Sequence, residues 1–323
     1  MNDNSKETPE PKKQDEQAWT KEAKREQEHE LQHEQAQSSV PPLPAEEKTG
    51  PDALISKPGS YGWEPVSTAA ASLPNGRAVR SMRLVRKSAG NKLTAMMQVR
   101  NESGRYLRYV LDELCGFVDD IVIVDDASTD DTAALCRSCP KVVKLVSLPS
   151  PLFDKEWELR SLLWDTAVST GPDWLLSVDA DELYEERAKR AMRGLIDQDR
   201  YDWVGFRFYD MWGGLTHYRE DEYWNIHRRH TATLVRYFPG FPYIYPQLNH
   251  HVPRLPVPFG TLPGLLTEFR VKHLGWAGSL EDRVRKYIRY KRIDPDGRWG
   301  SLAQYESILD LNPNLVEWKE EAE

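Results

Sequence analysis

The chain of 323 residues contains 43 lysine and arginine residues against 51 aspartate and glutamate residues, which gives a net charge of −8. This acidic balance argues against a protein that coats nucleic acid, because such proteins are normally basic. Hydrophobic residues make up 39% of the chain, whereas the share in most globular proteins is about 45–50%.

The first 90 residues account for much of this deficit. Residues 1–50 carry a net charge of −5 and few large apolar side chains, and residues 51–90 are rich in proline, serine, glycine and alanine. Such segments cannot bury enough apolar surface to offset the chain entropy lost on folding. We therefore predict a disordered, charged and proline-rich tail over residues 1–90. The remaining residues, about 230, suffice for one sizeable core.

The sequence lacks the marks of a membrane-spanning or exported protein. Its N-terminus is polar and charged, and no apolar run approaches the roughly 18–20 residues that a spanning helix needs. Cys115, Cys136 and Cys139 are too few for a disulfide framework, and Cys136-x-x-Cys139 without a second pair indicates a helix end rather than a zinc or redox site. A reducing compartment, the cytoplasm, is the expected location.

Strands and helices alternate over residues 91–210. Short apolar and β-branched runs predict strands, and apolar residues at helical spacing predict the helices between them. The predicted strands cover 93–99, 121–124, 142–148, 174–178 and 203–209, and the predicted helices cover 106–117, 131–137, 156–169 and 186–196. This alternation indicates an α/β fold whose sheet is mostly parallel and flanked by helices.

Residues 211–300 differ in composition and are rich in aromatic residues, histidine, arginine and proline. Strands are predicted at 231–237 and 267–272. A basic amphipathic helix is predicted to follow at 279–292, and residues 301–323 are predicted to form a short helix and then a frayed end.

The basic helix has an apolar side on which Val284, Tyr287 and Ile288 are predicted to face the core. Lys286 and Tyr290–Arg292 could close over a bound diphosphate. A solvated face is the simpler interpretation for most of them.

Acidic residues follow two of the predicted strands. Asp125 and Asp126 come after the run IVIV, and Asp179-Ala180-Asp181-Glu182 comes after WLLSV. In an open parallel sheet, ligands bind beyond the carboxyl ends of the strands. Neighbouring carboxylates repel one another unless a cation or a shared proton relieves them, and their hard oxygen atoms suit magnesium or manganese. Such an ion is often shared with a substrate diphosphate, whose departure it would assist.

The motifs together resemble glycosyltransferase family 2, whose members have the GT-A fold. The resemblance rests on the strings LTAMMQVRNESGRYLRYVLDEL, VDDIVIVDDASTDDT and WLLSVDADEL in this order. It covers residues 92–210 well and residues 211–295 more loosely. It implies a nucleotide-sugar-binding half over 91–210, an acceptor-binding and metal-completing half over 211–300, and a C-terminal helix and tail over 301–323.

The resemblance implies a role for each matching residue. Asp126 would accept a hydrogen bond from the nucleotide base, Arg160 would lie near the diphosphate, and Asp179 and Asp181 would bind the divalent cation, Mn²⁺ or Mg²⁺, and the diphosphate. His273 would complete the metal site. The residues expected to line the nucleotide pocket are Val99, Arg100, Asn101, Glu102, Asp125, Asp126, Arg160 and Asp179.

The implied reaction moves a sugar from a nucleotide-diphosphate donor, expected to be a UDP-sugar, to an acceptor hydroxyl with inversion. Inverting members use a carboxylate base, for which Asp221 is the first candidate and Glu222 and Asp210 are the reserves. The acceptor is left open among a glycan, a lipid and a protein, and the basic helix allows peripheral contact with the inner face of a membrane. One or two of Trp212, Tyr218, Trp224 and Trp276 could stack on sugar rings.

Two other interpretations stay open. An apolar strand followed by Asp-x-Asp also begins haloacid-dehalogenase-like phosphatases, but these need threonine or valine where this chain has Leu183. The second alternative is an inactive scaffold that binds a sugar nucleotide without turning it over. Activity toward a nucleotide sugar, toward a generic phosphate ester, or toward neither would distinguish the three.

Overall fold

The computed structural model describes residues 62–65, 82–298 and 300–321. Most of the predicted tail therefore lies outside the described residues. Within residues 51–90, however, strand β1 (Gly62–Pro65) pairs antiparallel with β2 (Met82–Val85). Regular structure thus begins before residue 91, where the sequence predicts the folded part to start. The reason is that a short strand pair needs only backbone partners and leaves no strong apolar pattern.

The half of the sheet that follows is parallel, as predicted. Strand β3 lies at its centre and pairs with β4 and β6, and β4 pairs with β5 at the edge. The strands are β3 (Leu93–Val99), β4 (Asp120–Asp125), β5 (Val142–Ser147) and β6 (Trp174–Ser177). The connecting helices are α2 (Leu107–Leu114), α3 (Thr132–Ser138) and α4 (Glu156–Val168).

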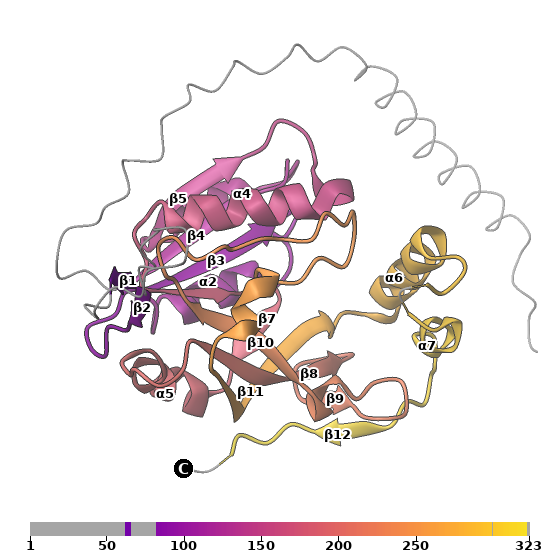
Figure 1. Cartoon of the computed structure of the whole chain (residues 1–323). Coiled ribbons are helices and arrows are strands. Elements are labelled where there is room, and N and C mark those ends of the chain that lie inside the picture. Colours follow the sequence, from indigo (N-terminus) through magenta and orange to yellow (C-terminus); the bar gives the residue numbers. More distant parts are fainter. Residues whose placement is uncertain (1–61, 66–81, 299, 322–323) are drawn as a thin grey trace, which may run out of the picture. The chain divides into compact units, whose positions relative to one another are not determined.

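Strand β4 shows why a short apolar run becomes a central strand. Ile121 and Ile123 pack into the cluster that contains α2 and α3, whereas Val122 and Val124 pack into the cluster that contains α4. All four are fully buried, because successive side chains of a strand point to opposite faces and helices cover both. Figure 1 shows α4 along one face of this part of the sheet.

The other half of the sheet is mixed. Strand β10 (His230–Arg236) lies between β6 and β8 (Trp203–Trp212) and runs antiparallel to both. Strand β11 (Gly264–Trp276) pairs parallel with β8 and antiparallel with β7 (Glu182–Tyr184). The predicted α/β class is thus confirmed, but the parallel pairing does not extend across β10. Hydrophobic periodicity shows that a segment is a strand without showing which strand is its neighbour.

The C-terminal part departs from the prediction in two places. After helix α7 (Leu302–Ser307), residues predicted to fray form strand β12 (Leu315–Glu317), which pairs with β9 (His217–Arg219). In helix α6 (Leu280–Ile293), Ile288 is 59% exposed and does not face the core. Among the helices of the described ranges, none is both long and apolar enough to span a bilayer.

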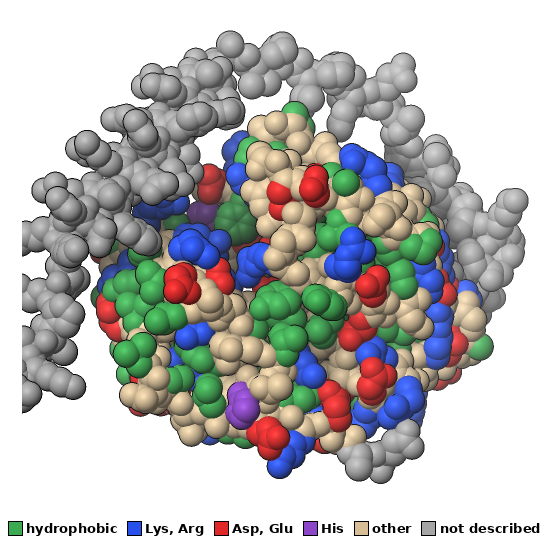
Figure 2. Space-filling model, turned by 180° about the vertical axis from the view of Figure 1, so that it is seen from behind, with side chains coloured by type: hydrophobic (Ala, Val, Ile, Leu, Met, Phe, Trp, Pro, Cys, Tyr) green, Lys and Arg blue, Asp and Glu red, His purple; other side chains and the backbone are tan. Residues whose placement is uncertain are grey.

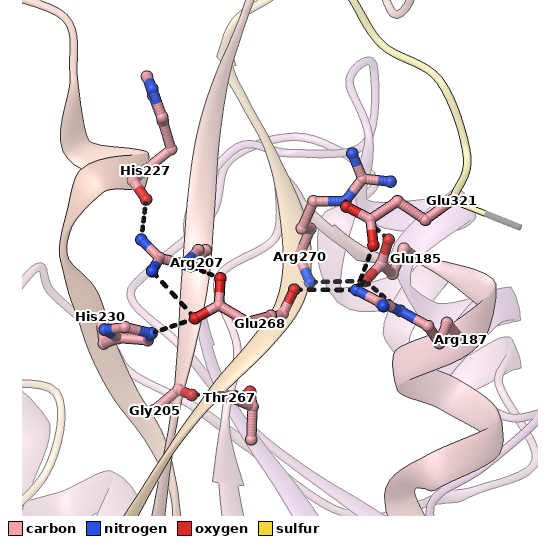
Figure 3. A network of polar contacts seen from close by, with 10 residues as sticks. All are labelled: Glu185, Arg187, Gly205, Arg207, His227, His230, Thr267, Glu268, Arg270 and Glu321. Atoms are coloured by element: carbon pink, nitrogen blue, oxygen red, sulfur yellow. Dashed lines mark hydrogen bonds and ion pairs between the residues drawn. The ribbon is translucent and has the colours of Figure 1, made fainter. Parts of the chain in front are cut away.

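Helix α5 (Glu186–Ile196) is joined to β11 by a buried ion pair (Figure 3). Arg270 donates from its backbone N–H (2.9 Å) and from Nε (2.8 Å) to the carboxylate of Glu185. Its guanidinium also lies over the ring of Trp318, 4.2 Å from the centroid, and donates to the carbonyl of Lys319. Arg270 therefore connects the α5 N-terminus to the last described residues of the chain.

Charges of both signs alternate over the surface that Figure 2 presents, with acidic and basic side chains interspersed.

We expect Glu185→Ala to lower the free energy of unfolding by about 3 kcal/mol, because the buried guanidinium of Arg270 loses its buried counter-charge and keeps only the more distant, half-exposed Glu321 (3.5 Å). Glu186→Ala is the matched control: its side chain is 64% exposed and pairs with Lys189 at the surface, so a loss below about 1 kcal/mol is expected. Urea unfolding followed by circular dichroism measures both. Equal losses in the two variants would contradict the prediction.

Candidate functional site

The loops after β3 and β4 hold each other at the carboxyl edge of the sheet. The Oδ1 atom of Asn101 accepts a hydrogen bond from the Thr129 N–H (2.8 Å), and Ser128 Oγ accepts one from the Asn101 N–H (3.0 Å). Asn101 (φ 54°) and Ala127 (φ 56°) both adopt the left-handed region, which is costly for residues other than glycine. Such backbone conformations cluster at ligand sites, where the surrounding structure enforces them.

Asp126 presents an unused acceptor in this loop pair. Its Oδ1 atom accepts from the Leu152 N–H (2.6 Å), whereas its buried Oδ2 atom has no hydrogen-bond partner among the described residues. Arg100 is the nearby cation, with Nη1 3.8 Å from Oδ2. Asp125 instead stabilises the turn, since its Oδ1 accepts from the Ser128 N–H (3.0 Å). Asp126 is therefore the member of this pair that can accept from a ligand N–H.

Other residues predicted for the nucleotide pocket also lie at this edge. Val99 is buried in the core, and its carbonyl accepts from the Asp126 N–H (2.9 Å). Glu102 holds the loop through its N–H, which donates to Thr132 Oγ1 (2.7 Å), and its Oε2 atom is buried without a described partner. Burial raises the pKa of Glu102 to about 7.

The first aspartate of the Asp-x-Asp motif contacts an arginine that the sequence analysis missed. Arg254 Nη2 lies 2.7 Å from Asp179 Oδ2, and the same guanidinium binds Glu182 through both of its terminal nitrogens, Nη1 at 2.8 Å. The fully buried Glu182 in turn accepts from the Asp179 N–H (3.0 Å). Burial raises the pKa of Asp179, but Arg254 and Arg160 outweigh it and lower the pKa below its usual value.

Arg254 is positioned by the segment that packs on α4. The Tyr245 hydroxyl donates to the Arg254 carbonyl (3.1 Å), and the Val252 N–H donates to Glu156 on α4 (3.2 Å). Tyr245 and Val252 also belong to the apolar cluster beneath α4. The segment has neither helical nor strand periodicity, so nothing in its pattern links Arg254 to the acidic motif.

Arg160 lies on α4, as predicted, and is buried. It pairs with Glu156 one turn earlier on the helix (Nη2–Oε1 3.2 Å), and its charge acts on Asp179. A buried guanidinium facing a carboxylate cluster is available to a phosphate group.

The second aspartate of the motif faces His273. The Nε2 atom of His273 lies 3.9 Å from Asp181 Oδ2, and its Nδ1 atom lies 2.6 Å from Asp210 Oδ1. Strand pairing brings these residues together: His273 is opposite Glu182 across β7–β11 and opposite Asp210 across β8–β11. Burial lowers the pKa of His273, but Asp181 and Asp210 outweigh burial and raise it to about 9.

Gly275 keeps the space beside His273 open. A Cβ atom at this position would lie 2.7 Å from His273 Nε2 and 3.4 Å from Asp181 Oδ2. The carboxylate and the imidazole are suitable donors for manganese, and a side chain at position 275 would occupy the space beside both. Within the described part of the chain, no three histidine, cysteine, aspartate or glutamate side chains form a ready metal cluster. Asp181 and His273 therefore fit a cation that takes its other ligands from substrate and water.

Lys286 points toward this site, whereas the sequence favours a solvated position. Its Nζ atom donates to the Gly275 carbonyl and lies 4.8 Å from the centroid of the Trp276 ring. Burial lowers the pKa of Lys286 to about 8, against the opposing effect of Asp181. Helix α6 begins with a capping box between Ser279 and Asp282, which fixes its N-terminal turn next to Gly275.

The three candidate bases have different surroundings. Asp221 Oδ1 accepts from the N–H groups of Tyr223 (2.9 Å) and Trp224 (3.0 Å), and its Oδ2 accepts from Arg219 Nε (2.6 Å). Glu222 is exposed. Asp210 is the one of the three that contacts His273.

The aromatic residues considered for sugar stacking are mostly engaged with one another. Trp212, Trp224 and Trp276 are buried, and their ring centroids lie 4.7–5.7 Å apart. Tyr218 packs edge-on against Tyr209. In these contacts they act as core residues, which is the commoner role of aromatic side chains.

Comparison with known proteins agrees with this geometry. Residues 94–249 match the family model Glycosyl transferase family 2. This match covers just under half of the chain and identifies residues 94–249 as a segment of this family. An uncharacterised protein of Mycobacterium tuberculosis is 30% identical over 235 residues, covering 68% of this chain and 54% of that protein. An uncharacterised glycosyltransferase of Rickettsia conorii is 28% identical over 122 residues, covering 36% of this chain and 39% of that protein.

This chain spans about half of the length of the mycobacterial protein. Among solved structures, S. aureus TarS 1–349 in complex with UDP has a TM-score of 0.43 and 17% identity, covering 68% of this chain and 69% of that one. The expected α/β class, a sheet flanked by helices, is confirmed by the element order and strand pairing of this chain itself.

We expect Arg254→Ala to lower the free energy of unfolding by about 3 kcal/mol at neutral pH, because Asp179 and Glu182 lose their shared counter-charge. Without the guanidinium, the pKa of both carboxyls in the folded state rises. The variant is then most stable at low pH, where the two carboxyls are protonated, and it loses stability as the pH rises. Its free energy of unfolding therefore lies further below that of the wild-type protein at pH 8 than at pH 5.

Chemical denaturation of this variant at both pH values tests the prediction. Arg298→Ala is the control, because Arg298 is 77% exposed and pairs at the surface with Asp296 (Nη2–Oδ2 3.5 Å), so a change below about 1 kcal/mol is expected at both pH values. A deficit for Arg254→Ala that is the same at pH 5 and pH 8 would contradict the assigned charges.

Proposed function

We propose that this protein transfers a sugar from a nucleotide-diphosphate donor to an acceptor hydroxyl. The observation that carries the proposal is the meeting of acidic residues from β4 and from the end of β6 at one sheet edge, with His273 facing Asp181. The family match supports a glycosyltransferase over the phosphatase alternative. This chain spans about half of the length of its mycobacterial relative. We therefore propose the transfer reaction for the whole protein as well as for the matched segment.

The donor is proposed to be a uridine nucleotide. The buried Oδ2 atom of Asp126, which has no hydrogen-bond partner among the described residues, is an acceptor that matches an imide N–H, which uracil carries at its Watson–Crick edge. Thymine has the same group, so a thymidine nucleotide is the competing donor. A guanine base offers a ring N–H of similar chemistry but is larger, and it serves as the third probe.

The diphosphate is proposed to lie among Arg160, Lys286, Asp181 and His273. Arg160 supplies a planar donor on one side and Lys286 a compact ammonium on the other. Asp181 and His273 would hold Mn²⁺ or Mg²⁺, with Asp179 kept in place by Arg254. When bound, the cation would offset the negative charge that develops on the leaving diphosphate.

The acceptor hydroxyl must lose its proton as its oxygen attacks the anomeric carbon with inversion. Asp221, Glu222 and Asp210 are the proposed bases, and their contacts favour Asp210. Asp221 is engaged by two backbone N–H groups and by Arg219, and Glu222 is exposed. Asp210 lies beside His273 and uses Oδ1 for that contact. We propose a glycan, a lipid or a protein as the acceptor, which are the three classes that the sequence allows.

Titration calorimetry with UDP, dTDP and GDP, with and without Mn²⁺, tests the donor site. We expect UDP to bind most tightly and Mn²⁺ to strengthen the binding. Asp181→Asn should abolish the effect of Mn²⁺, and Asp126→Asn should weaken UDP binding by about 10–100-fold in both conditions, the value of a hydrogen bond to a charged group. Asp131→Asn, at an exposed helix start, is the control without effect.

A folded protein that binds none of the three nucleotides would overturn the proposed donor site. Binding that is tight and manganese-dependent but accompanied by no release of UDP from any UDP-sugar would instead support the scaffold alternative.

Asp210 and Asp221 are distinguished by turnover at saturating Mn²⁺ and UDP-sugar, with UDP release as the readout. We expect Asp210→Asn to lower kcat by about 100-fold or more, in the range of general-base catalysis, with UDP still bound. Asp221→Asn should lower Tm, because the turn at residues 221–224 loses charge-assisted bonds, and should leave kcat within about tenfold. The reverse pattern would return the base to Asp221.

A further inference from the structure

Two of the three cysteines lie in contact outside the proposed donor site. Cys115 Sγ is 3.1 Å from Cys139 Sγ. Cys115 directly follows α2 and Cys139 directly follows α3, and both thiols are free and partly exposed. A disulfide bond needs a sulfur–sulfur distance of about 2.05 Å, so a movement of about 1 Å would bring the pair to bonding distance.

The backbone at the two positions explains why these cysteines meet. Cys115 continues the turn of α2, and its N–H donates to the Leu111 carbonyl (3.0 Å). Cys139 has left the helical conformation (φ −80°, ψ 121°), which separates its side chain from that of Cys136. Cys136 is fully buried in the core, where burial raises the pKa of its thiol to about 12. The two sulfur atoms that lie close to each other are therefore those of Cys115 and Cys139, and not those of the Cys136-x-x-Cys139 motif.

We propose that Cys115 and Cys139 form a reversible disulfide under oxidising conditions, with a low-molecular-weight disulfide such as oxidised glutathione as the oxidant. One cysteine thiolate attacks a glutathione sulfur and expels one glutathione thiolate. The second cysteine thiolate then attacks the mixed disulfide at the protein sulfur and expels the other glutathione. The two protein thiols lose two protons and two electrons, and oxidised glutathione gains them as two molecules of glutathione.

The bond would close a segment that carries part of the proposed donor site. Between Cys115 and Cys139, which are 24 positions apart, lie β4, Asp125, Asp126 and α3. At their other ends, α2 and α3 begin at the loops that Asn101 and Thr129 hold together. A covalent link between the helix ends would restrict the unfolded chain and stabilise this segment, while the small movement leaves the loops in place.

The intact protein is incubated in glutathione buffers of graded redox potential, quenched with acid, and alkylated in denaturant without reductant. Trypsin alone is insufficient, because Cys115 and Cys136 share one tryptic peptide, so cleavage before Asp119 by a second protease is included. We expect a cross-linked peptide pair containing Cys115 and Cys139, with Cys136 alkylated in every sample. Burial, together with the neighbouring Cys139 thiol, raises the pKa of Cys115 to about 11, so formation should accelerate as the pH rises.

Three variants provide the controls. Cys115→Ser and Cys139→Ser should each abolish the cross-link, and Cys136→Ser should retain it. Oxidised wild-type protein should melt roughly 5–10 °C above the reduced protein, a difference that Cys115→Ser lacks. UDP binding should be unchanged, which makes this test independent of the proposed function.

Stable mixed disulfides with glutathione in place of the cross-link would overturn the proposal. So would three thiols that stay free at potentials where an unstrained dithiol is oxidised. The peptide mapping on wild-type protein gives this answer even where a serine variant fails to fold.

Discussion

Repulsion between carboxylates is the constraint around which this site is organised. Glu102, Asp126, Asp181, Glu182 and their neighbours gather at one edge of the sheet, some of them deeply buried. Several buried anions at close range cannot stay ionised unless cations or protons relieve them. In the structure, Arg254 pairs with Asp179 and Glu182, and His273 faces Asp181. Burial raises the pKa of Glu102, which favours its protonated form.

The second half of the chain contributes those cations. Arg254 comes from the segment over α4, His273 from β11 and Lys286 from α6, so each depends on a different packing contact. The mixed pairing of β8, β10 and β11 has its functional consequence here. Because β11 lies between β7 and β8, it sets His273 beside both the acidic motif and Asp210.

The sequence predicts the strands and helices of residues 91–210 well. Asp126 and Asp179 could be found from sequence because each follows an apolar strand, and the ends of parallel strands meet at one edge. Arg160 could be found because it lies on a regular helix. His273 follows from the resemblance, and the structure places its Nε2 atom 3.9 Å from Asp181 Oδ2. Asp221 illustrates the opposite case: an acidic residue in an irregular stretch shows nothing of the turn that engages it.

By itself, the sequence determined the order of strands and helices over residues 91–210 and the acidic motifs at the strand ends, because these depend on local periodicity and on side chains a few positions apart. Only the tertiary structure decided that β10 separates β6 from β8, that Arg254 and Lys286 face the acidic motif, and that Cys115 meets Cys139. Each of these contacts joins segments that share no local pattern. Their pairing is set by which packing buries the most apolar surface and leaves the fewest charges unpaired, a property of the whole fold.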